Sequence, residues 1–318
     1  MKVLVTGASG MLGGGVARAL ALRGDTVTVL QRRATGLGLR EVLGDVADPA
    51  VAAQAVAGQD AVVHLAAKVS VTGPWQEFER VNVGGTQELL TAARDAGVAR
   101  FVQVSSPSVA HAGKALVGAT AGPADPGHAR GHYARSKALA ERSALQADAP
   151  GFAVVAVRPH LVWGPGDTQL VGRIVQRAHA GRLVLINGGM ALIDSTFVDN
   201  AVDALVAALD RAPVVHGEAF VVTNGQPRTV RELLTRICQA CGAPAPTRSI
   251  AKSVAWSGGA VVETAWQALR RDDEPPMTRF LAEQLATAHW FDQRRTREAL
   301  QWAPRITLDE GFTRLHPS

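Results

Sequence analysis

The chain has 318 residues, of which 47% are hydrophobic and 19% are charged. This composition supplies a large apolar core and excludes a chain that is mostly disordered. The formal net charge is +5, which favours anionic partners, but the lysines and arginines are dispersed rather than gathered in blocks. We therefore expect a phosphorylated small molecule as the anionic partner, and no nucleic acid.

The two cysteines, Cys238 and Cys241, exclude a disulfide framework. They lie at the end of a helical pattern with no second pair of ligands. We interpret them as buried helix residues and expect no metal site.

The N-terminal residues predict a strand, not a leader peptide, because no charged region precedes an apolar stretch and a cleavage site. No stretch reaches the length of a transmembrane helix. Residues 253–269 come nearest, but Ser257, Gly258 and Glu263 interrupt them, and we interpret this segment as an amphipathic surface or lid helix. The sequence predicts a cytoplasmic protein without a transmembrane segment.

Apolar runs alternate with helical patterns through the first half of the chain. The predicted strands are Lys2–Thr6, Thr26–Gln31, Glu41–Gly44, Ala61–Leu65, Arg100–Ser105 and Ala153–Arg158. The predicted helices are Met11–Leu22, Pro49–Ala57, Phe78–Ala96 and Tyr133–Ala149. The strands lack period-2 alternation, which is typical of strands buried on both faces. Strict alternation of strand and helix predicts an α/β protein with a doubly wound parallel sheet, the Rossmann fold.

A glycine-rich loop directly follows the first predicted strand and opens the first predicted helix. Gly7, Gly10 and Gly13 have the G-x-x-G-x-x-G spacing, which lets the backbone approach a pyrophosphate at the N-terminus of the helix. We therefore predict a dinucleotide cofactor that contacts Gly7, Gly10 and the neighbouring Ser9, Met11 and Leu12.

The end of the second strand favours NADP(H) over NAD(H). NAD-binding loops usually carry an acidic residue here that binds the ribose 2′-hydroxyl. This strand ends instead on Gln31, Arg32 and Arg33. A neutral amide does not repel a 2′-phosphate, and either arginine could pair with it.

Two further strand ends are predicted to pass the cofactor. Asp45 and Val46 follow the third strand, where a carboxylate could accept a hydrogen bond from the adenine amino group or cap a turn. Leu65, Ala66 and Ala67 follow the fourth strand, where small side chains permit close approach. We expect His64 to be packed or hydrogen-bonded rather than catalytic.

After about residue 159 the strand–helix alternation loosens and proline and glycine become frequent. The helix Val198–Leu209 and the strand Ala219–Asn224 still fit the sheet. We therefore predict a dinucleotide-binding domain over residues 1–165, which residues 196–226 rejoin. Residues 166–195 and 227–318 are predicted to form a smaller C-terminal substrate-binding lobe.

The sharpest chemical signal is the pair Tyr133 and Lys137, which share one face of a predicted helix. A free phenol is a poor acid–base near neutral pH, and a nearby ammonium would lower its pKa. The fifth strand ends at Ser105 and Ser106, on the sheet edge where ligands bind. Ser106 could hydrogen-bond the same substrate oxygen as Tyr133, with Ser105 as its rival.

These motifs together resemble the extended short-chain dehydrogenase/reductase superfamily over essentially the whole chain. The landmarks in order are TGASGMLG, GDVAD, HLAA, VSS, YARSK, RPHLVWGPGD and FVDN. The resemblance implies that Tyr133 is the general acid/base, that Lys137 binds the nicotinamide ribose and that Ser106 polarises a carbonyl. It also implies that Asn82 bridges backbone segments near the site, that Val104, Pro159 and Leu161 contact the cofactor, and that the protein is a homodimer.

Two positions argue against a nucleotide sugar as substrate. Sugar-nucleotide epimerases typically carry an asparagine where this chain has Leu161, and a pyrophosphate-binding arginine where it has Ile193. The segments RPHLVWGPGD and DSTFVDN instead resemble the 3β-hydroxysteroid dehydrogenase-like group.

The tail PPMTRFLAEQLATAHWF is similar to that of bacterial 2-alkyl-3-oxoalkanoate reductases of long-chain olefin biosynthesis. This implies reduction of a hydrophobic β-keto acid, whose alkyl chain residues 254–269 could cover. A 3β-hydroxysteroid dehydrogenase, a sugar-nucleotide epimerase or dehydratase, and a non-catalytic NADP(H)-binding regulator are the alternatives. A regulator usually lacks the tyrosine or the lysine, and both are present here.

Overall fold

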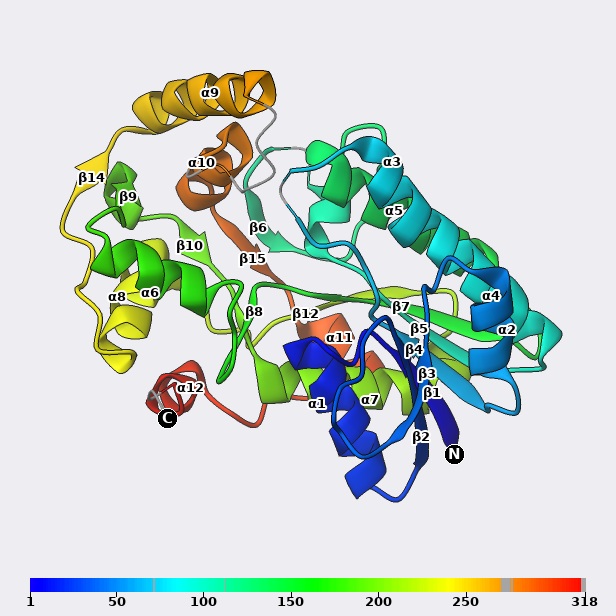
Figure 1. Ribbon diagram of the computed structural model, residues 1–318. Coiled ribbons are helices and arrows are strands. Elements are labelled where there is room, and N and C mark those ends of the chain that lie inside the picture. Colours follow the sequence, from blue (N-terminus) through cyan, green and yellow to red (C-terminus); the bar gives the residue numbers. More distant parts are fainter. Residues whose placement is uncertain (71, 112, 270–274, 276, 316–318) are drawn as a thin grey trace.

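A seven-stranded parallel sheet forms the centre of the protein in the computed structural model, which describes residues 1–70, 72–111, 113–269, 275 and 277–315. The strand order is β12-β7-β5-β4-β1-β2-β3 (Figure 1). The bounds are β1 Lys2–Thr6, β2 Thr26–Gln31, β3 Arg40–Leu43, β4 Ala61–His64, β5 Arg100–Val104, β7 Ala153–Pro159 and β12 Ala219–Val222. The order reverses between β1 and β4, and ligands of such sheets bind at the carboxyl ends beside this point. The predicted doubly wound fold is confirmed.

Helices cover both faces of this sheet. Helices α1 (Met11–Leu22) and α7 (Val198–Val215) pack on one face, and α2 (Pro49–Val56), α4 (Gly85–Asp95) and α5 (Gly131–Gln146) cover the other. Alternate strand residues point to opposite faces of the sheet. Val3 and Val5 pack in the hydrophobic core under α1 and α7, whereas Leu4 packs in the core under α2 and α4. Both faces are therefore apolar, which explains why the strands show no polar alternation.

The predicted helix Phe78–Ala96 is wrong in its first part. The structure has a short helix α3 (Trp75–Phe78), a π-helix η1 (Glu79–Gly84) and then α4. The wide π-turn holds Asn82, whose Oδ1 accepts from Lys68 N at 2.6 Å and whose Nδ2 donates to Lys68 O at 3.1 Å. Hydrophobic periodicity does not distinguish such a turn from an α-helix, and π-turns are frequent at functional sites.

The smaller part of the protein is built around a four-stranded sheet of order β13-β10-β15-β6. Its strands are β13 Arg228–Thr229, β10 Leu192–Ile193, β15 His289–Phe291 and β6 Leu116–Ala119. Two further ladders pair β11 (Thr196–Phe197) with β8 (Val162–Trp163), and β14 (Ser249–Ile250) with β9 (Leu185–Ile186). Strand β6, which belongs to the first half of the chain, thus completes a sheet made otherwise by the second half.

Helices surround these ladders at the far side from the N-terminus (Figure 1). They are α6 Val171–His179, α8 Val230–Ala240, α9 Lys252–Ala268, α10 Arg279–Ala286 and α12 Leu308–Thr313, with the 3₁₀ turn η3 Asn187–Gly189. Helix α11 (Arg294–Leu300) packs instead against α7 and β12, and the 3₁₀ turn η2 (Pro107–Ala110) lies against α5. Cys238 is buried in α8, whereas Cys241 is only half-buried at its end, so the interpretation of two buried cysteines holds for one of them.

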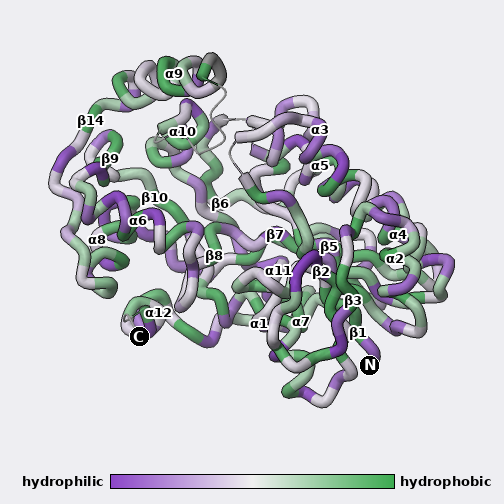
Figure 2. The backbone as a smooth tube through the Cα atoms, in the orientation of Figure 1, coloured by the Kyte–Doolittle hydropathy of each residue, from purple (hydrophilic) through white to green (hydrophobic). Residues whose placement is uncertain are grey.

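Helix α9 is the outermost of these helices and packs against α10. Ala255 and Gly259 are buried, while Val254 and Val261 are more than half exposed, and hydrophobic and polar residues are interspersed along the helix (Figure 2). This agrees with the amphipathic surface helix expected here. No helix within the described ranges is long and apolar enough to cross a membrane.

A buried ion pair joins α5 to β7. Glu141 and Arg158 are essentially inaccessible to solvent, and their side chains meet through two hydrogen bonds, from Arg158 Nε at 2.8 Å and from Nη2 at 2.5 Å. The third nitrogen, Nη1, donates to Gly122 O at 2.8 Å. All of the buried charge is therefore matched, as buried ions require.

Substitution of Glu141→Ala is expected to lower the free energy of unfolding by about 3–5 kcal/mol, because it leaves the Arg158 guanidinium buried and unpaired. Urea unfolding followed by circular dichroism measures this loss. The control is Glu218→Ala, which removes an exposed partner that also lies 2.5 Å from its arginine, Arg295. That change should cost less than about 1 kcal/mol. Equal losses from the two variants would contradict the role given to burial.

Candidate active site

Helix α5 brings Tyr133 and Lys137 to the carboxyl end of β5. Lys137 is buried, and its Nζ donates to Val104 O, the last residue of β5, at 2.5 Å. Tyr133 lies one helical turn earlier on the same face and is half-buried. Its hydroxyl makes no hydrogen bond within the described ranges. The predicted pair therefore lies at the ligand-binding edge of the sheet, with the phenol available to a ligand.

The acid–base properties of this pair follow from burial. Burial raises the pKa of Tyr133 to about 12, and it lowers the pKa of Lys137 to about 8 although the Glu141 carboxylate acts in the opposite direction. The expectation that Lys137 lowers the pKa of Tyr133 is not met in this structure, because burial dominates. The phenol is therefore protonated at neutral pH, which is the form that can give a proton to a carbonyl oxygen.

The two serines after β5 have different surroundings. Ser105 is buried, and its Oγ has no partner among the residues described. Ser106 is half-buried at the start of η2, where its Oγ accepts from Ser108 N at 3.3 Å and from Ser108 Oγ at 2.9 Å. Because Ser106 Oγ accepts both of these bonds, its own proton is left to point elsewhere. The geometry thus favours Ser106 as a donor to a ligand.

Asn82 connects the π-helix to helix α5, in keeping with the bridging role that the resemblance implied. Its Nδ2 also donates to Ser136 Oγ at 2.9 Å, and Ser136 Oγ in turn donates to Tyr133 O at 2.9 Å. Together with the two bonds to Lys68, this fixes the loop after β4 against the first turn of α5. The backbone that carries the phenol is held from two sides.

The glycine-rich loop has the form that a pyrophosphate site requires. Gly7 has φ +73°, and a Cβ there would lie 2.9 Å from Ala66 N, while a Cβ on Gly13 would lie 2.3 Å from Gly7 O. Gly10, at the start of α1, meets nothing closer than 3.5 Å. No side chain caps α1 and no acidic residue lies in its first turn. The backbone N–H groups of the first turn of α1 are therefore not capped by a side chain, and together with the positive end of the helix dipole they fit a phosphate. Ser9, Met11 and Leu12 lie at the same turn.

The end of β2 also fits a cofactor. Gln31 is buried, and neither its amide nitrogen nor its amide oxygen has a partner in the described parts of the chain. Buried polar groups are nearly always hydrogen-bonded, so this amide is suited to a ribose hydroxyl or phosphate oxygen. Arg32 and Arg33 follow it and are exposed at the same strand end. The three side chains at the end of β2, Gln31, Arg32 and Arg33, are therefore neutral or positively charged.

A hydrogen-bonded chain links the first and fourth strands at the switch point. His64 Nδ1 contacts Thr6 Oγ1 at 2.8 Å and its Nε2 contacts Thr86 Oγ1 at 3.1 Å, while burial lowers the pKa of His64 to about 3. Thr6 Oγ1 also accepts from Leu65 N and Ala66 N. His64 is thus a packed, neutral histidine as expected. Leu65, Ala66 and Ala67 are half-buried and lie beside Gly7.

The other predicted cofactor contacts lie along the same edge. Val46 is buried, and Asp45 is half-buried with its Oδ2 2.6 Å from Arg80 Nη1. Pro159 is the last residue of β7 and Leu161 follows the strand, and both are half-buried. Leu161 has φ +43°, a region that costs a branched residue energy and that asparagine tolerates better.

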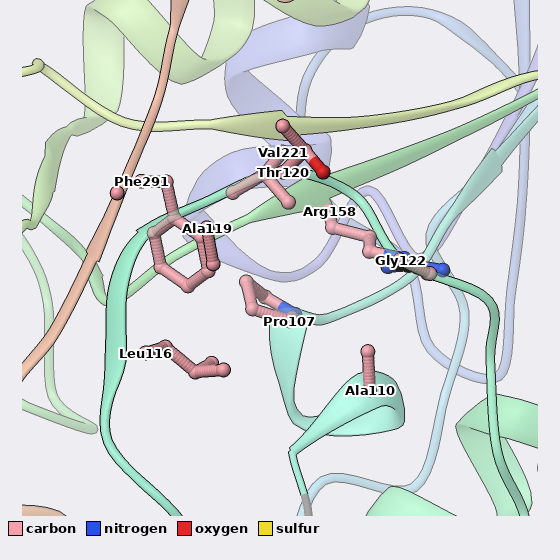
Figure 3. A pocket seen from close by; sticks show the side chains of 10 residues that line it. Pro107, Ala110, Leu116, Ala119, Thr120, Gly122, Arg158, Val221 and Phe291 are labelled. Atoms are coloured by element: carbon pink, nitrogen blue, oxygen red, sulfur yellow. Dashed lines mark hydrogen bonds between the residues drawn. The ribbon is translucent and has the colours of Figure 1, made fainter.

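A cavity of about 410 Å³ is lined by Pro107, the residue that follows Ser106. Figure 3 shows Phe291, Leu116 and Pro107 around one end of it and Arg158 with Gly122 at the other. Leu116 and Phe291 come from β6 and β15. Most of the residues that line the cavity are apolar. The charged one, Arg158, is paired with Glu141.

Residues 3–223 match the family described as the NAD dependent epimerase/dehydratase family. The chain belongs to this family. A 2-alkyl-3-oxoalkanoate reductase of Stenotrophomonas maltophilia is 40% identical over all of this chain and 99% of its own length. A 3 beta-hydroxysteroid dehydrogenase/Delta 5-->4-isomerase of Mycobacterium tuberculosis is 32% identical over 99% of this chain and 90% of its own length.

A solved structure of a DesIV double mutant, a dTDP-glucose 4,6-dehydratase of Streptomyces venezuelae with NAD bound, superposes with a TM-score of 0.76. It is 25% identical over 99% of this chain and 95% of that one. The chain is an extended short-chain dehydrogenase/reductase, an NAD(P)-dependent oxidoreductase with a nicotinamide cofactor, as the resemblance implied.

Several residues that shape the site have no signal in the sequence. Ser108 orients Ser106, Ser136 joins Asn82 to α5, and Arg80 binds Asp45. A serine or arginine on a helix usually faces solvent, so residue type alone does not mark them. No group of three or more His, Cys, Asp or Glu in the described residues is arranged to hold a metal ion.

The lowered pKa of Lys137 predicts a pH dependence of stability. A lysine whose folded pKa lies below its ordinary value contributes stability above the ordinary pKa and loses it as the pH falls through the folded pKa, here from about 10.5 to about 8. The free energy of unfolding of the wild type, relative to Lys137→Met, should therefore rise by about 3 kcal/mol as the pH increases from about 8 to about 10.5. Urea unfolding at several pH values measures it, and a constant difference would contradict the burial of a charged amine.

Proposed function

We propose that this protein uses NADP(H) to reduce a ketone on a hydrophobic substrate, and that the substrate is a 2-alkyl-3-oxoalkanoate, which becomes the 3-hydroxy acid. The observation that carries the proposal is the bond from Lys137 Nζ to Val104 O. It holds the Tyr133 helix against the strand end from which Ser106 extends. A proton donor and a carbonyl-binding hydroxyl therefore converge at one edge of the sheet.

The preference for NADP(H) rests on charge. The end of β2 offers the unpartnered amide of Gln31 and the exposed guanidinium groups of Arg32 and Arg33. A carboxylate at this strand end would bind a ribose 2′-hydroxyl and repel a 2′-phosphate, and none is present. The arrangement supports a phosphate at this place.

The substrate proposal rests on the wall of the site and on the relatives. Leu161 and Ile193 stand where sugar-nucleotide enzymes have polar groups, and Ile193 is buried in the core. An apolar side chain cannot replace a charge-assisted bond to a pyrophosphate. The cavity lined by Pro107 is largely apolar, and the relative from Stenotrophomonas maltophilia is described as acting on 2-alkyl-3-oxoalkanoates.

In this proposal each residue has a separate task. A dinucleotide held at the glycine-rich loop and at Gln31 would supply a hydride for the carbonyl carbon. Ser106 donates a hydrogen bond to the carbonyl oxygen, and Tyr133, which is protonated at neutral pH, gives that oxygen its proton. Lys137, one turn along the same face of α5, carries the positive charge that would stabilise the phenolate left by this transfer. Asn82 and Ser136 hold the backbone of Tyr133 in place.

The direct test follows absorbance at 340 nm with NADPH or NADH and a long-chain 2-alkyl-3-oxoalkanoic acid. In parallel, a 3β-hydroxysteroid is offered with NADP⁺ or NAD⁺, and conversion of a UDP-hexose in the presence of NAD⁺ is followed by chromatography of the products, because epimerisation leaves no net change in the cofactor. Oxidation of NADPH by the keto acid, faster than oxidation of NADH, supports the proposal. Turnover of the UDP-hexose with an inert keto acid would overturn the interpretation of Leu161 and Ile193. The homodimer and the cytoplasmic location expected from the sequence stay predictions, which sedimentation and cell fractionation can test.

Replacement of Tyr133→Phe is expected to lower kcat by at least about 10²-fold, because the hydroxyl that carries the proton is removed. Cofactor binding, measured by quenching of intrinsic fluorescence, should change less than about twofold, since the ring remains. Unchanged turnover would contradict the mechanism, and loss of turnover together with cofactor binding would indicate structural damage.

A paired substitution separates the two serines. We expect Ser106→Ala to reduce kcat by about 10²-fold through loss of the donor to the developing oxyanion. Ser105→Ala should keep most of the activity, because its buried Oγ makes no hydrogen bond in the described structure. The reverse order of effects would assign the carbonyl to Ser105.

A further inference from the structure

An acidic residue lies beside the arginines that would face the cofactor phosphate. Asp45 follows β3, whose last residue pairs with Gln31, and Gly44 N donates to Gln31 O at 3.0 Å. Burial alone would raise the pKa of the Asp45 carboxyl, but the Ala47 N–H, Arg80 and Arg32 together hold it below its ordinary value. Asp45 therefore lies within electrostatic reach of Arg32, one of the residues assigned to the 2′-phosphate.

Arg80 forms an ion pair with the Asp45 carboxylate. Its Nη1 lies 2.6 Å from Asp45 Oδ2, and Ala47 N donates to the other oxygen, Oδ1, at 3.0 Å. By contrast, no hydrogen bond or ion pair of Arg32 or Arg33 is found among the described residues. Both oxygens of Asp45 are thus bound without either of these arginines.

The π-helix sets the position of Arg80. Helix α4 follows it immediately, and a Cβ on Gly85 would lie 2.8 Å from Val46 Cγ1, so the end of the π-helix is pressed against the loop after β3. In the same π-helix, Asn82 is anchored to Lys68 and Ser136. The backbone under Arg80 is therefore fixed relative to Asp45.

We propose that Arg80 is a positioning residue for cofactor selectivity: it binds Asp45 so that Arg32 stays available to the 2′-phosphate of NADP(H). This inference rests on the proposed NADP(H) preference. Without Arg80, the freed carboxylate attracts Arg32 and adds an unpaired negative charge beside the phosphate. Both effects weaken binding of a 2′-phosphorylated ribose, and neither concerns a ribose with a free 2′-hydroxyl.

The ion pair is suited to a test because the stability of the fold does not depend on it. The side chains of Arg80 and Asp45 are 56% and 32% exposed, and such pairs contribute little to folding. Arg80→Ala should therefore fold normally, which thermal unfolding verifies. Any change in cofactor affinity then reports on the electrostatics of the site.

The experiment measures dissociation constants of NADPH, NADH, 2′,5′-ADP and 5′-ADP by isothermal titration calorimetry. For Arg80→Ala we expect binding of NADPH and 2′,5′-ADP to weaken about tenfold and that of NADH and 5′-ADP to change less than about twofold. Arg80→Lys should keep part of the selectivity. The double variant Arg80→Ala, Asp45→Asn should recover it, because no carboxylate is then free to bind Arg32.

Arg295→Ala, which breaks a distant exposed pair with Glu218, is the matched control and should leave all four constants unchanged. An unchanged NADPH to NADH ratio in Arg80→Ala, or no recovery in the double variant, overturns the inference. If the wild type itself does not prefer NADPH and Arg32→Ala has no effect on 2′,5′-ADP, the proposed cofactor preference fails instead. The two failures are therefore distinguishable.

Discussion

The buried ammonium of Lys137 is the charge around which helix α5 and the strand ends beside it are arranged. Tyr133, Lys137 and Glu141 follow one another at four-residue spacing on one face of α5. The first lies near the carboxyl edge of the sheet, the second binds the end of β5, and the third binds Arg158 on β7. A positive, a negative and a second positive charge thus lie in sequence beneath the helix, and this alternation makes their burial tolerable.

This row of charges fixes helix α5 to the central sheet. Helix α5 is attached to β5 by a carbonyl, to β7 by a carboxylate–guanidinium pair, and through Arg158 to the loop at Gly122. On its other side, Ser136 joins it to the π-helix. These polar contacts fix the helix that carries the Tyr133 phenol. An acid–base group needs such a fixed support, because it must meet a substrate oxygen within a few tenths of an ångström.

The sheet, its helices and the placement of Tyr133 and Lys137 on one helix could be predicted because each leaves a pattern in the sequence: apolar strands, a glycine-rich turn, and two side chains four residues apart. The π-helix could not, since a single inserted residue hardly alters the hydrophobic periodicity of Phe78–Ala96. The pKa of Tyr133 was expected to move downward because spacing shows a neighbouring cation but not the burial that opposes it. Contacts such as Ser108 to Ser106 and Arg80 to Asp45 depend on tertiary geometry alone.

The pairing of β6 with β15 has a consequence for how the chain can fold. Leu116 lies beside His289 in this ladder, more than half the chain away in sequence. Such a ladder closes only after the intervening segments are in place, so it is entropically late in folding. A nascent or truncated chain that ends before β15 leaves both edges of β6 unpaired, whereas the folded chain leaves one, and another chain can add a strand there. The part of the molecule that completes the wall of the cavity at Pro107 is thus also the part most exposed to misassembly before synthesis ends.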